Sequence, residues 1–554
     1  MPDGRGAGAG TGDTVPFAAP ALPTPLAELV TDPGADGPAG PVADLRWRRR
    51  EPAADTTPDA GTVASTDGTP DGTPDGTPDG TAHPTEPEDA ATGAVEGAPP
   101  GWRPSAGAVT ALAGRAPGAW IVGVGEGRER DWRAAGATVV RALRDAPDAA
   151  LRTGDGAAGT GGADPAPRVA TLRPDRPEDA PATAADWAAL ALGVVLGSHR
   201  FSVRSDAHTR PPLRVHLDVP PEHRDAVARA VELATATARA RDLADTPSGT
   251  KSPDWFATTA ADLVGDADGL EVTIRDEAWL AEQDFGGVLA VGGGSSRPPR
   301  LLELRWAPAD AGADHVVLVG KGITFDTGGI SIKPNAGMAD MRTDCSGGAA
   351  VVGALRALAR LRVPVRVTGL VPLAENHVSG SSYRPGDIVR HRGGTTSEVT
   401  NTDAEGRMVL ADAIAYALEE LAPDVVVDVA TLTGAMKVAL GVRTGGVFAS
   451  SPALRSALVD AGAATGESWW PMPLSAHHDA DVDSTIADVR QAPGGPGGIA
   501  AALFLRRFTA ERPWIHLDIA GPARCDSPHE EVAKGATGFS ARTLVEFCAA
   551  RARA

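Results

Sequence analysis

The sequence predicts an α/β protein, in which a smaller N-terminal α/β domain precedes a larger α/β/α domain with a mixed, mainly parallel sheet. In the C-terminal half, short apolar segments rich in β-branched residues alternate with longer segments rich in Ala and Leu. Charged residues follow directly after several apolar segments, where open α/β sheets place their ligands. A chain of 554 residues is also long enough for two or more domains.

The C-terminal part, residues 245–554, has the clearest elements. Three apolar runs are predicted to be buried strands, at residues 315–319, 363–373 and 425–430. Two amphipathic segments are predicted to be helices, at residues 346–361 and 407–421. Because the charged residues lie at strand ends and in the loops that follow, we expect one site at the edge of the sheet.

The N-terminal third is less regular, but strands and helices alternate there too. Strands are predicted at residues 119–124, 169–172 and 213–217, and helices at residues 132–143 and 182–196. We expect these elements to form one domain over residues 15–220, after a disordered tail at residues 1–14. A long helix over residues 221–244 is predicted to join this domain to the C-terminal part.

Residues 52–100 are predicted to be a disordered insertion in the N-terminal domain. Residues 67–81 repeat the unit Asp-Gly-Thr-Pro, and their flanks are rich in Pro, Gly, Thr and acidic residues. Such a segment cannot bury enough apolar surface to offset the entropy lost on ordering. A second loose stretch is predicted at residues 154–167.

Residues 401–407, with the sequence Asn-Thr-Asp-Ala-Glu-Gly-Arg, are the most informative stretch of the chain. If this segment is extended, Asp403, Glu405 and Arg407 point to the same side. Two carboxylates on one side repel each other unless a cation lies between them, so the pattern favours a metal site. An arginine beside them can hold an anion or a developing oxyanion. A solvated turn with a salt bridge is the simpler alternative for so short a pattern.

A second group of charged residues lies between residues 319 and 348. Lys321 follows the predicted strand at 315–319 and is flanked by glycines, and Asp326, Lys333 and Asp344 come after it. This group supplies a second set of carboxylates beside a strand end. It therefore shifts the interpretation of residues 401–407 from a solvated turn towards a metal site.

Together these residues resemble the leucyl aminopeptidase family, also called cytosol aminopeptidases, which are two-metal exopeptidases. The resemblance spans roughly the last three hundred residues, about two typical domain lengths. It also covers residues 430–434, 494–498, 516–521 and 534–538. It implies hydrolysis of the N-terminal residue of peptides, preferentially leucine or another apolar residue. It further implies an N-terminal domain similar to macro domains and a homohexamer with active sites facing an interior cavity.

The resemblance implies a role for each site residue. The metal ligands would be Lys321, Asp326, Asp344, Asp403 and Glu405, which would hold two divalent ions, Mn or Zn. The catalytic residues would be Lys333 and Arg407, and Arg407 would hold a bicarbonate ion that serves as general base. The first substrate side chain would be surrounded by Met341, Thr431, Leu432 and Ala520. Residues 345–348, Cys-Ser-Gly-Gly, differ modestly from the usual Met-x-Gly-Ala pattern, which would affect the pocket and spare the metals.

The chemistry of this residue set is consistent with such a reaction. A lysine binds a metal only as the neutral amine, so Lys321 must be dry and close to the ion. Five ligands that contribute mostly oxygen suit hard or borderline dications. Two ions about 3.5–4 Å apart can share a water and lower its pKa towards neutral, so that the hydroxide attacks the first peptide carbonyl. Lys333, as an ammonium, would stabilise the developing negative charge on the carbonyl oxygen.

Other catalytic and binding patterns are incomplete in this sequence. A P-loop would need Gly in place of His315 and Ser or Thr in place of Gly322. The three cysteines form no Cys-x-x-Cys pair, and the pair His529-Glu530 lacks the second histidine of a zincin. A non-catalytic binding protein and a degenerate enzyme are the alternatives. The complete set of site residues disfavours the degenerate enzyme.

The composition fits a cytoplasmic enzyme, and the resemblance implies that its substrates are peptides. The formal net charge of -20 disfavours nucleic acid as a partner. The few cysteines suit a reducing compartment. We expect no signal peptide, because the first residues contain no apolar core, and no membrane span, because no long apolar run occurs.

Deleting residues 52–100 is expected to leave metal content, kcat and oligomer size nearly unchanged, because low-complexity inserts at surface loops are usually tolerated. Steady-state kinetics and light scattering on the deletion variant measure this. The alternative is that the acidic segment gates substrate entry or recruits a partner. A collapse of the oligomer, or a large change in activity on long peptides only, would support that alternative.

Overall fold

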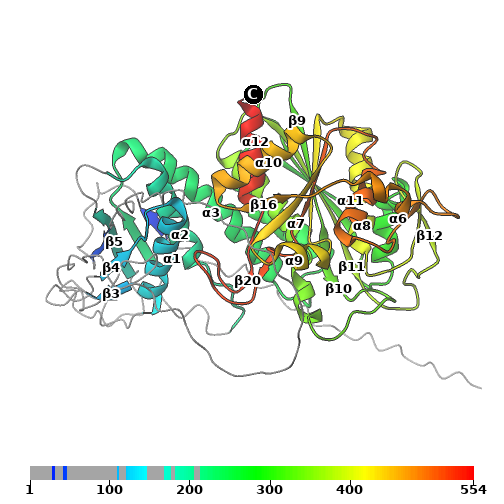
Figure 1. Cartoon of the computed structure of the whole chain (residues 1–554), viewed down its shortest axis with the longest axis horizontal. Coiled ribbons are helices and arrows are strands. Elements are labelled where there is room, and N and C mark those ends of the chain that lie inside the picture. The colour runs from blue at the N-terminus through cyan, green and yellow to red at the C-terminus, as the bar shows by residue number, and fades with distance from the viewer. Residues whose placement is uncertain are drawn as a thin grey trace, which may run out of the picture.

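The computed structural model describes residues 28–30, 42–46, 109–111, 120–145, 168–175, 181–204 and 213–553. The predicted tail at residues 1–14, the insertion at 52–100 and the loose stretch at 154–167 lie outside these residues. Within the described residues, strands and helices alternate along the chain around two larger sheets (Figure 1). The α/β fold class predicted from the sequence is therefore confirmed.

The N-terminal strands form a six-stranded sheet in the order β1-β6-β5-β2-β4-β3. The strands are β1 (Glu28–Val30), β2 (Val42–Arg46), β3 (Val109–Ala111), β4 (Trp120–Gly123), β5 (Arg168–Asp175) and β6 (Leu213–Leu217). Neighbours are parallel except for the antiparallel pair β3 and β4. The predicted strands at 119–124, 169–172 and 213–217 correspond to β4, β5 and β6. Strands β1, β2 and β3 were not predicted.

Two helices pack beside this sheet, α1 (Glu129–Asp145) and α2 (Ala184–Ser198). They correspond to the predicted helices at 132–143 and 182–196, with ends that differ by two or three residues. Helix α2 begins where the Thr183 side chain accepts a hydrogen bond from the Asp186 amide and Asp186 accepts one from Thr183 in return. Buried Trp132 and Leu190 contribute to the core between the helices and the sheet.

Helix α3 (Arg224–Asp245) follows the N-terminal sheet and contacts both α2 and α7 (Ser346–Arg360). A 3-10 turn over Pro221–His223 precedes it, so the predicted helix at 221–244 starts with this turn. Pro221 favours such a start because proline fixes the backbone angle of a first turn. The domain boundaries proposed from the sequence remain a prediction.

A nine-stranded sheet forms the centre of the C-terminal half, with a path β16-β15-β18-β14-β9-β11-β8-β7 and β10 paired to β11. These strands are β7 (Leu270–Arg275), β8 (Arg300–Trp306), β9 (His315–Gly320), β10 (Gly322–Asp326), β11 (Arg366–Asn376), β14 (Val425–Ala430), β15 (Thr444–Ala449), β16 (Ser468–Pro471) and β18 (Trp514–Asp518). The central strands β18, β14, β9, β11 and β10 run parallel, while β7, β8 and β15 pair antiparallel with a neighbour. The sheet is mixed and mainly parallel, as predicted.

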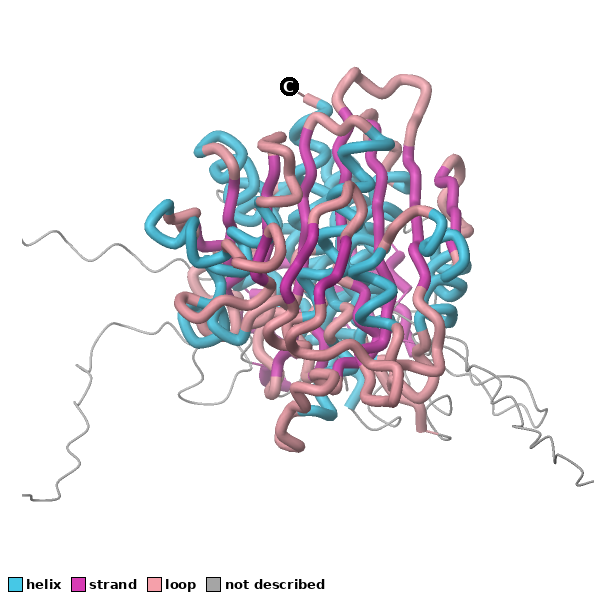
Figure 2. The backbone as a smooth tube through the Cα atoms, turned by 90° about the vertical axis from the view of Figure 1, so that its right-hand side faces the viewer, coloured by secondary structure: helices cyan, strands magenta, loops and turns pink. Residues whose placement is uncertain are grey.

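Helices cover both faces of this sheet, and Figure 2 shows its strands running side by side between them. One apolar core contains residues of α3, α4 (Pro253–Val264), α7, α10 (Pro452–Thr465) and α12 (Ala541–Ala552). The other contains residues of α5 (Glu277–Glu282), α6 (Gly286–Gly292), α8 (Glu405–Tyr416), α9 (Gly434–Leu440) and α11 (Gly497–Arg506). Strand β9 joins both cores, because Val316 and Leu318 face one while Val317 and Val319 face the other. This explains why the strand is a continuous apolar run in the sequence.

Short elements complete the C-terminal half. Three strands form a small sheet, β12 (Ile388–Arg390), β13 (Thr396–Glu398) and β17 (Val489–Arg490), and two form another, β19 (Arg524–Cys525) and β20 (Gly535–Ala536). The 3-10 turns are η3 (Met338–Thr343) and η5 (Ala476–Val482). Among the helices of the described residues, none combines the length and apolar character that a bilayer span requires.

Two predicted element boundaries were wrong. The strand predicted at 363–373 is β11, which begins at Arg366 and ends at Asn376. The helix predicted at 407–421 begins at Glu405, and its last five residues form a π-helical turn, η4 (Ala417–Leu421). The first of these shifts brings Asn376 to the end of a central strand, next to the site. The second changes the geometry of residues 401–407.

Candidate active site

The predicted site residues line one cavity of about 410 Å³, at the ends of β9, β10 and β14. The lining includes all five predicted metal ligands, Lys321, Asp326, Asp344, Asp403 and Glu405. It also includes Lys333 and all four predicted pocket residues, Met341, Thr431, Leu432 and Ala520. The fold therefore brings together ten residues that are scattered over 200 positions of the sequence.

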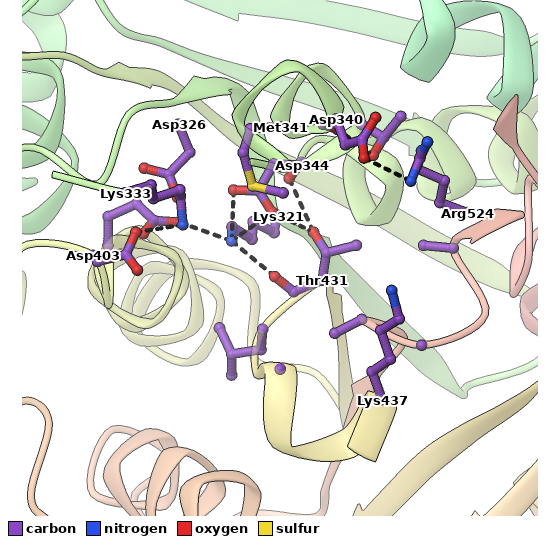
Figure 3. A pocket seen from close by; sticks show the side chains of 18 of the residues that line it. Lys321, Asp326, Lys333, Asp340, Met341, Asp344, Asp403, Thr431, Lys437 and Arg524 are labelled. Carbon is purple, nitrogen blue, oxygen red and sulfur yellow. Dashed lines mark hydrogen bonds and ion pairs between the residues drawn. The ribbon is translucent and has the colours of Figure 1, made fainter. Parts of the chain in front are cut away.

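Lys321 lies at the centre of the cavity floor (Figure 3). It follows β9 directly and is buried. Its Nζ lies 2.9 Å from both carboxylate oxygens of Asp344 and 2.8 Å from Glu405 Oε1, and it donates to the Thr431 carbonyl at 2.9 Å. Gly406 leaves room for this side chain, since a Cβ there would lie 2.6 Å from Lys321 Cε.

Lys333 forms ion pairs with the other two carboxylates of the cluster, those of Asp326 and Asp403. Its Nζ lies 2.7 Å from Asp326 Oδ2 and forms an ion pair with Asp403 Oδ1. Two hydrogen bonds hold the Asp326 side chain in place, because its Oδ1 accepts from the Gly328 amide at 2.8 Å and from Asn376 Nδ2 at 2.7 Å. Asn376 was not identified from the sequence; it comes from a different strand, β11, and also donates to the Thr402 carbonyl at 3.0 Å.

The pKa shifts show how crowded these carboxylates are. Burial raises the pKa of Asp326 well above its usual value, and the charges of Glu405 and Asp344 raise it further. Burial also raises the pKa of Asp344, to about 6, although Lys321 opposes the shift. The pKa of Glu405 is lowered, because Lys321 and Lys333 outweigh its burial. Two ammonium groups thus only partly compensate four carboxylates.

The site fits a bound divalent cation by its unsatisfied atoms and by its charge. Among the described residues, the buried Glu405 Oε2 has no partner, and Glu405 Oε1, Asp344 Oδ2 and Asp403 Oδ1 have none besides the ammonium groups of Lys321 and Lys333. Asp326, Asp403 and Glu405 each place one oxygen within 4.8 Å of the others, a spacing that a single ion can bridge. Uncompensated buried carboxylates are costly without a counter-ion, and oxygen-rich clusters suit hard or borderline dications.

The lysine ligand has to lose a proton before it can bind an ion. Burial alone would lower the pKa of Lys321, but the charges of Asp344, Glu405 and Asp326 outweigh burial and raise it. Lys321 is therefore an ammonium in this arrangement and itself serves as a counter-ion. A dication placed among the same carboxylates would replace that charge and favour the neutral amine.

Arg407 does not line the cavity, and the expectation of an extended segment from Asp403 to Arg407 was wrong. Helix α8 begins at Glu405, so Glu405 and Arg407 are separated by a helical rotation rather than by strand alternation. The Arg407 Nη1 donates to the Gln491 carbonyl at 2.7 Å, and its buried Nε has no partner among the described residues. Burial lowers its pKa to about 10. Its proposed contact with bicarbonate remains a prediction.

The sequence did not identify four charged residues that also line the cavity. Asp340, Lys437 and Arg524 lie on the side away from Asp403 in Figure 3, and Asp526, which pairs with Arg524, is the fourth. Asp340 could have been found, because it precedes the predicted pocket residue Met341. The other three had no recognisable spacing, since they come from α9 and from the segment after β18.

Two buried histidine clusters lie apart from this cavity and are structural. His516 pairs with Asp428 at 2.6 Å inside the sheet, where both side chains are fully buried. His391 contacts Asp412 at 2.8 Å and Ser397 Oγ at 2.9 Å, an arrangement like that of a serine hydrolase. All three side chains are fully buried, so no substrate can reach this serine.

Comparisons with known proteins agree with the geometry of the cavity. The sequence profile of the cytosol aminopeptidase family catalytic domain matches residues 238–545. The chain belongs to the cytosol aminopeptidase family. Probable cytosol aminopeptidases from Rhodococcus opacus (strain B4) and Roseiflexus castenholzii are each 45% identical to it, over 374 and 391 residues. These alignments cover 65% and 68% of this chain, and 74% and 79% of the relatives.

Solved structures of this family have the same fold over most of the chain. The bottromycin maturation enzyme BotP in complex with Mn is 40% identical with a TM-score of 0.72, over 82% of this chain and 95% of that one. The cytosol aminopeptidase from Coxiella burnetii is 31% identical with a TM-score of 0.68, over 81% and 90%. Membership of the family supports metal-dependent aminopeptidase activity for this chain.

Proposed function

We propose that this chain removes N-terminal leucine or another apolar residue from peptides, using two divalent ions, Mn or Zn, held by the predicted ligands. The observation that carries this proposal is one cavity that contains all five ligand residues beside Lys333 and four largely apolar lining residues. Lys321, Asp326, Asp344, Asp403 and Glu405 would hold the ions. When bound, such ions would supply a water that is deprotonated near neutral pH and would polarise the peptide carbonyl.

The acidic cluster accounts for the need for a free amino terminus. A substrate ammonium is attracted to the surplus of carboxylates, which the described lysines only partly neutralise. A free amine can also complete the coordination of an ion in the cluster. An acylated amine can do neither, so the cavity favours exopeptidase substrates.

Lys333 supplies a positive charge next to the carbonyl that is cleaved. Burial would lower its pKa, but Asp326, Glu405 and Asp344 outweigh burial and raise it, so the group stays an ammonium. It is half-buried at the cavity wall, where water does not fully screen its charge. It can therefore stabilise the negative charge that develops on the carbonyl oxygen during attack.

Leucyl and methionyl p-nitroanilides are expected to be cleaved much faster than aspartyl or glutamyl p-nitroanilides, and N-acetyl-leucyl p-nitroanilide is expected to be inert. Met341, Thr431, Leu432 and Ala520 carry no charge, so a first-residue carboxylate would lose its hydration there without a partner. The initial rates of the Mn-loaded protein on these substrates measure this order of preference. Efficient release of aspartate with leucine ignored would overturn the pocket assignment, and cleavage of the acetylated substrate would contradict an exopeptidase.

The homohexamer, the cytoplasmic location and the bicarbonate at Arg407 also remain proposals. The names of the relatives, which call them cytosol aminopeptidases, support the location. The unpartnered buried Nε of Arg407 supports a bound anion near this side chain. Sedimentation analysis and the bicarbonate dependence of kcat would test the assembly and the anion.

A further inference from the structure

The cavity has two unlike sides. One side holds the four carboxylates with Lys321 and Lys333, and the other is lined by Asp340, Lys437, Arg524 and Asp526. In Figure 3, Thr431 lies between Lys321 and Lys437, and the Lys437 amine points towards the side where Arg524 lies. Lys437 thus lies on the far side of Thr431 from Lys321, and Thr431 is one of the residues assigned to the first substrate side chain.

Lys437 keeps an uncompensated positive charge in this second group. Arg524 Nη1 lies 2.7 Å from Asp340 Oδ2 and 2.9 Å from Asp526 Oδ1, so two carboxylates balance its guanidinium. Lys321 and Lys333 are paired with the acidic cluster. Among the cations that line the cavity, Lys437 alone forms no ion pair with the residues that the structure describes. Its side chain is exposed and free to meet a negatively charged ligand.

Close packing fixes the place of Lys437 beside the predicted pocket. Helix α9 starts two residues after Leu432, and its Met436 is buried in the core. The turn at Ala520 and Gly521 presses against the same helix, since a Cβ on Gly521 would lie 3.5 Å from Lys437 Cα and 2.2 Å from the Gly441 carbonyl. The lysine is therefore held next to two pocket residues by backbone contacts, and only its flexible side chain is left to move.

Lysine is a rare choice in this chain. The sequence has 52 basic residues, of which only five are lysines, and three of those five, Lys321, Lys333 and Lys437, line the cavity. Elsewhere arginine supplies almost every positive charge. A lysine carries a compact charge on a flexible stem, which suits contact with a carboxylate that arrives in varied positions.

Resting on the proposed function, we propose that Lys437 binds a carboxylate on the residue that follows the scissile bond. The substrate amine is drawn to the acidic side, and the first side chain occupies the apolar residues, so the next residue extends towards Lys437. The carboxylate is either the α-carboxylate of a dipeptide or the side chain of Asp or Glu. A cavity of about 410 Å³ is within the range of small-molecule sites, which favours short peptides.

The test compares pairs of substrates that differ only in this carboxylate, using the full chain loaded with Mn. One pair is Leu-Gly and Leu-Gly-amide, and the other is Leu-Asp-amide and Leu-Asn-amide. In at least one pair, the substrate that has the carboxylate is expected to have a kcat/KM about tenfold higher than its uncharged partner in the unmodified protein, as a charge-assisted hydrogen bond provides. This ratio of charged to uncharged substrate is expected to arise mainly from KM. The ratio is expected to fall to near one in Lys437→Gln and below one in Lys437→Glu. Lys534→Gln, at an exposed lysine that does not line the cavity, is the matched control and should keep the ratio.

The pair that responds identifies the source of the carboxylate. A merely structural role would change both members of each pair equally, so an unchanged ratio in both pairs overturns the proposal. A preference for an aspartyl first residue that disappears in Lys437→Gln also overturns it, because the lysine would then face the first side chain. Calorimetry with a non-cleavable reduced-bond analogue of each substrate measures the same preferences without turnover. If no leucyl substrate is hydrolysed, the proposed function fails, while the difference in Kd between paired analogues still decides the role of Lys437.

Discussion

Asp403→Asn and Glu405→Gln are each expected to abolish hydrolysis of leucyl p-nitroanilide and to lower the Mn content of the protein. Among the described residues, the buried Glu405 Oε2 has no partner, Glu405 Oε1 and Asp403 Oδ1 pair only with lysine, and the two side chains share a cluster with Asp326. The loss should exceed about 100-fold, since even the outer partners of metal ligands contribute about 10–100-fold. Activity assays and metal analysis after desalting measure both effects.

The control for these variants is Asp460→Asn, at an exposed carboxylate on α10 that does not line the cavity. It makes the same chemical change and should keep both activity and metal. Thermal unfolding of the metal-free proteins separates loss of ligands from loss of fold. Asp403→Asn should not destabilise the empty cluster, because burial and the charge of Glu405 raise the pKa of Asp403, whereas Glu405→Gln removes a carboxylate that the lysines favour. Full metal stoichiometry and full activity in both ligand variants would refute the metal assignment.

Lys333→Ala is expected to lower kcat by about 10²–10³ while the metal content stays unchanged, as removal of an oxyanion donor does. The ammonium acts where negative charge develops in the transition state, so its loss should affect kcat more than KM. Lys333 also pairs with Asp326 and Asp403, and its removal leaves these carboxylates free for the ions. Steady-state kinetics at saturating Mn, with Lys534→Ala as the control, measure the effect. A change confined to KM would contradict this role.

The central part of the fold could be predicted from the sequence, because strands that are buried on both faces appear there as continuous apolar runs. Strand β14 was located to the residue and β9 to within one residue, since both are continuous apolar runs buried on two faces. The charged residues after these strands then had to meet at one edge of the sheet. For this reason Lys321 could be placed at the site from its position after β9, while the roles of Asp326 and Asp344 were implied by the resemblance.

What the sequence could not predict depends on contacts between distant segments. The pattern Asp-x-Glu-x-Arg suits a strand or a turn into a helix equally well, and only the packing of α8 decides that Arg407 turns away towards Gln491. Lys437 and Arg524 reach the cavity from segments that share no motif with the ligands. Their roles follow from tertiary structure alone.

The most direct test of a metal-dependent aminopeptidase is a titration of metal-stripped protein with Mn, followed by leucyl p-nitroanilide hydrolysis. The four carboxylates of the cavity need cations, so we expect no turnover after chelation and a rise in rate that saturates at two ions per subunit. Asp403→Asn, titrated in parallel, should bind fewer ions and stay inactive. Undiminished turnover by the stripped protein, or saturation of Mn binding with no hydrolysis of any leucyl substrate, would contradict the account.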